Sequence, residues 1–218
     1  MFLQQPPIKP AIFIKPKLYL KTYNHEIVSF PKRDIAVVEG YNYNQQVNLI
    51  VNDDPEANDV KIKIMSVNGI EYFKSQGRYF MYDADGKPLF NINQTNKIIY
   101  RGEDDSRILA KIESLGLKNN IKKYTISFHN LASENEETIY MCCDKYYCSC
   151  GIFHGNDEKG DSPLIGRVVE LMDANSFIAN AETRYSLDIA PNVDNVLIIA
   201  LAVFFINKSQ INRNRRFH

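Results

Sequence analysis

The sequence predicts a mainly β fold of the α+β class, in which one closed antiparallel barrel surrounds a single hydrophobic C-terminal helix. Two observations lead to this prediction. Short segments rich in β-branched and aromatic residues recur between polar turns, and one long apolar run, Val196–Ile206, follows them. A helix that is apolar all round must be covered on every side, and the strands are the only predicted elements that can cover it. Closing the sheet into a barrel also removes its exposed edges.

Roughly ten strands are predicted before residue 190, because the apolar residues there partly alternate with polar ones. No segment before that point has a convincing apolar stripe of helical period. Polar loops that contain Gly and Pro separate the strands. The clearest strand segments are DIAVVEG (34–40), QQVNLIVN (45–52), DVKIKIMSV (59–67), RYFMYDADGKPLFNIN (78–93), NKIIYRG (96–102), RILAKIES (107–114), KKYTISFHN (122–130) and ETIYMCCDKYYCSCGIF (137–153).

The apolar run Val196–Ile206 is predicted to be a core helix that does not span a membrane. Its 11 residues rise about 16 Å as a helix, whereas the hydrocarbon layer of a bilayer is about 30 Å thick. Polar residues close the run on both sides, at Asn195 and Asn207. The helix residues expected to contact the inner faces of the strands are Leu197, Ile199, Leu201, Phe204 and Phe205.

Length and composition predict a single intracellular domain. The 218 residues include 26 basic and 26 acidic ones, and this balance argues against a nucleic-acid partner. Prolines interrupt the N-terminus, so residues 1–14 are expected to form an extended arm. The domain is expected over residues 15–208, followed by a basic tail over 209–218. The sequence offers neither a secretory signal nor a cofactor motif, and its four cysteines are expected to be reduced, as in the cytoplasm.

Three segments resemble the LURP-one-related family, which belongs to the superfamily of Tubby C-terminal-like and phospholipid-scramblase-like domains. They are FMYDADGKPLFNI (80–92), IGRVVELMDANSF (165–177) and YSLDIAPNVDNVLIIALAVFFI (185–206). The family's hairpin motif falls on Asp83, Gly86, Leu89 and Phe90, and its terminal motif on Pro191, Val193 and Asp194. The resemblance implies a twelve-stranded barrel threaded by the terminal helix. It also implies a binding module for phospholipid, such as a phosphoinositide, or for a protein.

The DADG segment (83–86) is interpreted as a hairpin turn, because Gly86 is at the wrong position for an EF-hand loop. We expect no metal site in this protein, although two sets of residues could form one. The first is a zinc set in the cysteine-rich strands. Besides binding zinc, these cysteines could remain free thiols, form a redox pair, or be S-acylated, and the scramblase resemblance suggests the last of these. The second is an acidic calcium set that a scramblase-like protein would need. The zinc set comprises Cys143, Cys148, Cys150 and His154, and the calcium set comprises Asp173, Asn175, Glu182 and Asp188.

Basic residues gather locally although the net charge is zero. Lys118, Lys122 and Lys123 form one group, and we predict that they contact anionic phospholipid headgroups. Two further basic groups lie at Lys15–Lys21 and at Arg213–Arg216. We found no catalytic motif, so we expect a non-enzymatic binding module that is cytoplasmic or peripheral at a membrane. The alternatives are a scramblase-like membrane protein that responds to calcium and a stress- or defence-related protein that acts through protein contacts.

Overall fold

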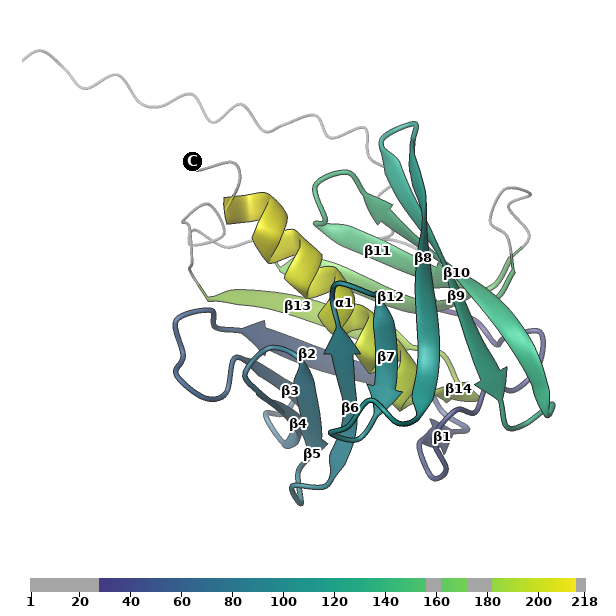
Figure 1. Cartoon of the computed structure of the whole chain (residues 1–218), viewed down its shortest axis with the longest axis horizontal. Helices are drawn as coiled ribbons and strands as arrows, with labels where there is room; N and C mark the ends of the chain where they lie inside the picture. The colour runs from purple at the N-terminus through teal and green to yellow at the C-terminus, as the bar shows by residue number, and fades with distance from the viewer. Residues whose placement is uncertain (1–27, 156–161, 172–181, 215–218) are drawn as a thin grey trace, which may run out of the picture.

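A computed structural model describes residues 28–155, 162–171 and 182–214. Twelve antiparallel strands close into a barrel in the order β10-β11-β12-β13-β2-β3-β4-β5-β6-β7-β8-β9 (Figure 1). The barrel strands are β2 (Val47–Asp53), β3 (Ile62–Ser66), β4 (Glu71–Gln76), β5 (Phe80–Asp83), β6 (Pro88–Asn93), β7 (Ile98–Arg101), β8 (Ile108–Lys118), β9 (Ile121–Asn130), β10 (Asn135–Asp144), β11 (Ser149–Phe153), β12 (Leu164–Leu171) and β13 (Thr183–Ile189). The predicted fold class is confirmed.

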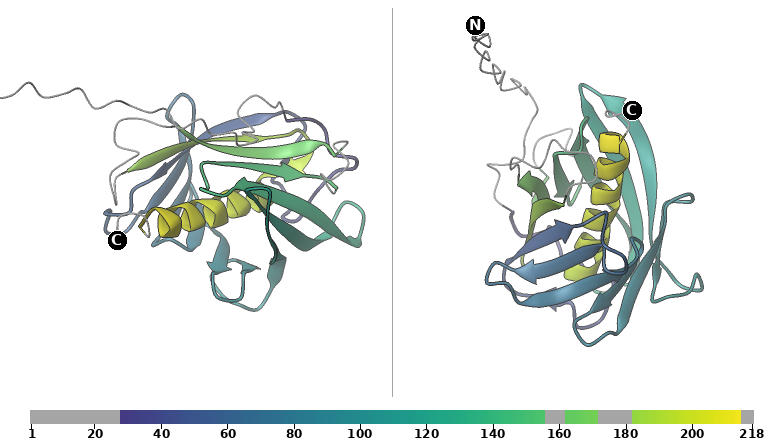
Figure 2. Two further views of the ribbon diagram at one scale, coloured as in Figure 1. Left: turned by 90° about the horizontal axis from the view of Figure 1, so that it is seen from above. Right: turned by 90° about the vertical axis from the view of Figure 1, so that its left-hand side faces the viewer.

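The helix α1 (Asn195–Asn214) runs inside this barrel (Figures 1 and 2). Every residue from Val196 to Ile206 is buried, and none exposes more than 2% of its surface. The helix is long and apolar enough to cross a membrane by length and composition, but 83% of the 18-residue stretch that meets this test is buried within the protein. Burial on all sides, as predicted, explains why the run has no polar face.

Side chains from separate strands hold the helix. The rings of Tyr124 on β9 and Phe204 meet edge-to-face with their centroids 5.5 Å apart, and Tyr185 on β13 meets Phe205 in the same way at 6.1 Å. On β12, Gly166 lies so close to Ile198 that a Cβ atom there would be 3.0 Å from Ile198 Cγ2. Leu197, Ile199 and Leu201 are also buried. Every residue from Val196 to Ile206 therefore belongs to the hydrophobic core.

Asp194 fixes the start of the helix and joins it to the segment that precedes the barrel. The short strand β14 (Val193–Asp194) pairs with β1 (Asn42–Tyr43), and α1 follows at once. One carboxylate oxygen of Asp194 accepts a hydrogen bond from the backbone N–H of Leu197 at 2.9 Å, as an N-cap does. The other accepts the N–H groups of Val37 and Val38, both at 2.7 Å. The Asp194 side chain that accepts these bonds is fully buried.

The structure differs from the predicted strands in three places. DIAVVEG (34–40) is not a strand, because its N–H groups at Val37 and Val38 bond to Asp194 and leave only a single β-bridge at Ile35. The strand segments predicted from the alternation of apolar residues do not include β4, β12 or β13. The helix continues eight residues beyond Ile206 to Asn214, so part of the predicted basic tail over 209–218 is helical. The predicted arm, residues 1–14, lies outside the described residues.

The turn at DADG forms as predicted. β5 ends at Asp83, and Gly86 has φ +81°, a backbone conformation that glycine adopts readily. The Gly86 N–H donates to the Asp83 carbonyl at 3.1 Å, and the Asp83 side chain accepts the Lys87 N–H at 2.8 Å. The aspartate therefore stabilises its own turn, as Asx turns do.

Candidate functional site

Strands β8 and β9 form a ribbon that extends beyond the rest of the barrel (Figure 1). The strands pair from Lys111–Ser127 to Lys118–Ile121, and a two-residue turn at Asn119–Asn120 joins them. Both turn residues have positive φ (52° and 63°), which is the geometry of a tight hairpin turn whose twist matches its strands. In the outer half of β8, from Glu113 to Lys118, every residue is exposed. We call residues 113–123 the ribbon tip.

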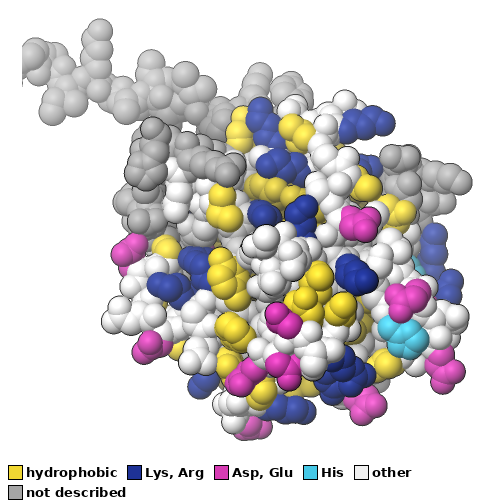
Figure 3. Space-filling view, viewed as in Figure 1, with side chains coloured by type: hydrophobic (Ala, Val, Ile, Leu, Met, Phe, Trp, Pro, Cys, Tyr) yellow, Lys and Arg dark blue, Asp and Glu magenta, His cyan; other side chains and the backbone are white. Residues whose placement is uncertain are grey.

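The ribbon tip exposes apolar side chains as well as basic ones. Leu115 is 57% exposed and Leu117 is 56% exposed. A bulge between Ser114 and Gly116 interrupts the register there, and Leu117 pairs with Lys122 across the ribbon. Basic and hydrophobic side chains lie close together at the top of the face shown in Figure 3. Exposed leucines in a projecting hairpin contribute nothing to the core, so they are candidates for contact with another surface.

The three predicted lipid-binding lysines all lie on this ribbon tip, but their surroundings differ. Lys118 is exposed, whereas Lys122 and Lys123 are half-buried. The ammonium of Lys122 lies over the ring of Tyr147, 4.3 Å from its centroid. Successive residues of a strand point to opposite faces, so Lys122 and Lys123 place their charges on the two sides of the ribbon.

Tyr147, which lies under the Lys122 ammonium, also contacts aromatic residues of the core. Its hydroxyl is 2.6 Å from that of Tyr124, and its ring lies 5.9 Å from the ring of Phe205. Burial and the hydrogen bond to Tyr124 raise the pKa of Tyr147 above its usual range, so the hydroxyl is neutral at physiological pH. Lys208 of the helix lies over Phe204 in a similar way, at 5.3 Å. Two lysine ammonium groups, those of Lys122 and Lys208, thus lie over aromatic rings of the core, where cation–π attraction favours them.

Sequence reasoning missed a polar network around the last turns of the helix. Gln210 donates to Asp53 Oδ2 at 2.6 Å, and Arg78 lies 3.0 Å from Asp53 Oδ1. Arg213 pairs with Glu170 at 2.9 Å. Burial raises the pKa of Asp53, although Arg78 and Gln210 oppose this effect. The partners are between 25 and 157 residues apart in the sequence, and each is unremarkable by itself, so no local pattern could have indicated them.

Comparison with known proteins decides the family. The sequence model of the LURP-one-related family matches residues 44–206. The chain belongs to the LURP-one-related family. No curated protein and no solved structure was found to match the chain.

The cysteines of this LURP-one-related barrel do not form a metal centre with His154. Cys143 and Cys150 are direct partners across β10 and β11, and both are 0% exposed. Burial raises the pKa of the Cys150 thiol well above its usual value, so it is not a thiolate at neutral pH. None of the four cysteines forms a disulfide, and Cys148 is half-buried. No group of three or more His, Cys, Asp or Glu side chains that could hold a metal ion occurs within the described ranges.

His154 of the zinc set and Asp188 of the calcium set have different partners. His154 Nδ1 accepts the backbone N–H of Lys32 at 3.1 Å, and its Nε2 lies 3.6 Å from Glu137. Asp188 pairs with Arg167 across β12 and β13. Glu182 is exposed. Asp173 and Asn175, together with the basic groups at Lys15–Lys21 and Arg215–Arg216, lie outside the described residues.

Proposed function

We propose that this LURP-one-related protein is a non-catalytic, intracellular module that binds anionic phospholipid surfaces through its ribbon tip. One observation supports the proposal most: the ribbon exposes Leu115 and Leu117 next to lysines, on a hairpin that extends away from the barrel. Peripheral membrane proteins combine these two features, since apolar groups enter the headgroup boundary and basic groups are attracted to anionic lipids. Four cysteines without a disulfide agree with an intracellular location.

The expected affinity follows from the size of the ribbon tip. Each basic residue near an anionic surface contributes about 1 kcal/mol. Full burial of a leucine contributes about 1.5–3 kcal/mol, so two half-exposed leucines add roughly 2 kcal/mol. The total of about 5 kcal/mol corresponds to a dissociation constant of the order of 0.1 mM. This value describes weak, reversible binding that depends on both kinds of side chain.

Vesicle flotation tests the proposal. The protein should float with vesicles of phosphatidylcholine that contain phosphatidylserine or a phosphoinositide, and should not float with phosphatidylcholine alone. The double variant Lys118→Glu/Lys123→Glu should weaken binding by about 30-fold or more, because two favourable charges are lost. Lys122 is left unchanged because its ammonium packs on Tyr147.

Two further variants separate charge from general damage. Leu115→Ser/Leu117→Ser should weaken binding to the same vesicles without changing the net charge. As a matched control, Lys63→Glu/Lys87→Glu reverses two exposed lysines that lie away from the ribbon tip and should retain most of the binding. Equal binding of wild type and both ribbon variants, or equal binding to neutral vesicles, would refute the proposal.

A further inference from the structure

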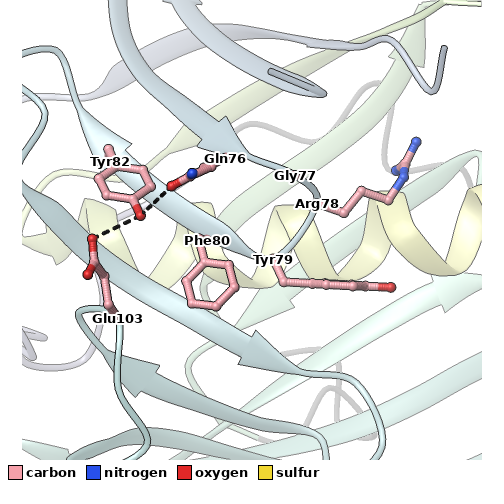
Figure 4. Close-up of a pocket in the computed structure, with 7 residues that line it drawn as sticks. All are labelled: Gln76, Gly77, Arg78, Tyr79, Phe80, Tyr82 and Glu103. Carbon is pink, nitrogen blue, oxygen red and sulfur yellow. Dashed lines mark hydrogen bonds between the residues drawn. The ribbon is translucent and has the colours of Figure 1, made fainter. Parts of the chain in front are cut away.

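A pocket of about 570 Å³ lies at strands β4 and β5 and the turn between them (Figure 4). These strands lie away from the ribbon tip in Figure 1. Its lining comprises Gln76, Gly77, Arg78, Tyr79, Phe80, Tyr82 and Glu103. We call it the aromatic pocket. We propose that the aromatic pocket binds the side chain of an arginine in a basic segment of a partner protein.

Aromatic surface is unusually available in this pocket. Tyr79 is 40% exposed and Phe80 is 39% exposed, although Phe80 begins a barrel strand. Tyr82 follows on the same face of β5, two residues along. Rings that present their faces to solvent attract cations, because the face of an aromatic ring carries partial negative charge.

A carboxylate is held at the edge of these rings. The hydroxyl of Tyr82 lies 3.0 Å from Glu103 Oε1 and 2.9 Å from Gln76 Oε1 (Figure 4). Burial and the neighbouring Glu103 raise the pKa of Tyr82, so its hydroxyl stays protonated and remains a donor. This contact fixes one oxygen of Glu103. The second oxygen accepts no hydrogen bond from the described residues, so it can receive a ligand's N–H group.

The charge of the pocket is negative although Arg78 lines it. The guanidinium of Arg78 is directed away from Glu103 (Figure 4), and it binds Asp53 at 3.0 Å and Asn207 at 3.1 Å. Arg78 therefore forms no ion pair with the carboxylate of Glu103. The next two residues of the same loop, Asp104 and Asp105, are exposed acids. The rim of the pocket thus complements a positively charged segment.

Arginine fits these groups better than other cations. Its planar guanidinium can stack on an aromatic ring and, at the same time, donate hydrogen bonds to a carboxylate and to an amide oxygen. A quaternary ammonium group, as in a choline headgroup, is attracted to the rings but has no N–H to donate to Glu103. The pocket volume lies within the range of sites that enclose one small ligand or side chain.

Titration followed by NMR tests this inference, with two short peptides that differ only in one residue. One peptide is Gly-Ser-Arg-Ser-Gly, and in the other citrulline replaces arginine, which removes the charge and keeps the shape. The arginine peptide should shift the amide signals of Gly77, Phe80 and Glu103 in a saturable way. The citrulline peptide and choline should each bind at least about fivefold more weakly.

Variants test the carboxylate directly. Glu103→Gln keeps an oxygen for Tyr82 and removes the charge, so it should weaken arginine-peptide binding at least about fivefold. Glu56→Gln changes an exposed acid on the β2–β3 loop and should leave the peptide affinity unchanged. Neither variant should alter vesicle flotation, so this inference and the proposed function can fail separately. Absence of shifts at the pocket residues, equal binding of the citrulline peptide, or equal binding of choline would overturn the inference.

Discussion

The close approach of Gly166 to the helix allows a quantitative test of the barrel interior. A Cβ atom at this position would lie 3.0 Å from Ile198 Cγ2 and 3.2 Å from Ile152 Cδ1. Both distances are shorter than an ordinary van der Waals contact, so Gly166→Ala forces the side chains of Ile198 and Ile152 to move by a few tenths of an ångström within a closely packed core. Overpacking of this kind costs about 1–3 kcal/mol of unfolding free energy. Ile198→Ala alone should cost about 2–5 kcal/mol, because it leaves a cavity.

The double variant Gly166→Ala/Ile198→Ala should be more stable than the two separate losses predict. The new methyl group of residue 166 would occupy space that the Ile198 side chain vacates, so the coupling should be at least about 1 kcal/mol. Urea denaturation followed by circular dichroism measures the three unfolding free energies, and it suits a chain without Trp.

A matched pair checks that the coupling is local. Val203 is also buried on the helix, and it lies about 7.5 Å further along the axis by the rise of an α-helix. The effects of Gly166→Ala and Val203→Ala should therefore add within about 0.5 kcal/mol. If Gly166→Ala and Ile198→Ala also add within that margin, the two residues are not in contact and the reasoning about the enclosed helix is wrong.

Two further predictions concern buried polar groups. Asp194→Ala should cost about 3 kcal/mol or more, because three buried N–H groups lose their acceptor; a loss below about 1 kcal/mol in urea denaturation would contradict this role. Burial lowers the pKa of His154, so below pH 6.5 the unfolded chain binds more protons at this residue than the folded protein does. The stability contributed by neutral His154 is complete above pH 6.5 and is lost as the pH falls towards the folded pKa. His154→Gln should therefore lose less stability than wild type between pH 7 and pH 5, and parallel stability curves would argue against it.

The fold could be predicted from the sequence where one segment carried its own physical constraint. The run Val196–Ile206 is too short to span a bilayer by itself and too apolar to face water, so its length and composition favoured a core position. The turn at DADG was recognisable because the aspartate and the glycine that stabilise it lie within four residues. The prediction of a strand at DIAVVEG was wrong for the opposite reason. The alternation of its residues resembled a strand, but two of its N–H groups bond to Asp194, which is more than 150 residues away.

The candidate sites depend even more on distant residues. The lysines of the ribbon tip were found as a local group, but the exposed leucines beside them looked like ordinary strand residues until the ribbon was seen to extend beyond the barrel. The aromatic pocket joins a turn after Gln76 to a loop at Glu103, and its rings do not stand out among 13 Tyr and 12 Phe. The polar network at the end of the helix was missed because Gln210 and Arg213 are polar residues whose buried partners, Asp53 and Glu170, lie on distant strands.

The order of the elements along the chain has a consequence for biosynthesis. The helix that fills the barrel follows all of its strands, and it begins 148 residues after β2 starts at Val47. At typical translation rates of about 5–20 residues per second, the first barrel strand waits roughly 7–30 seconds before synthesis reaches its central packing partner. During that interval the inner, hydrophobic face of the growing sheet has no helix to pack against. The nascent chain is therefore most vulnerable to mispairing and aggregation just before synthesis reaches the helix.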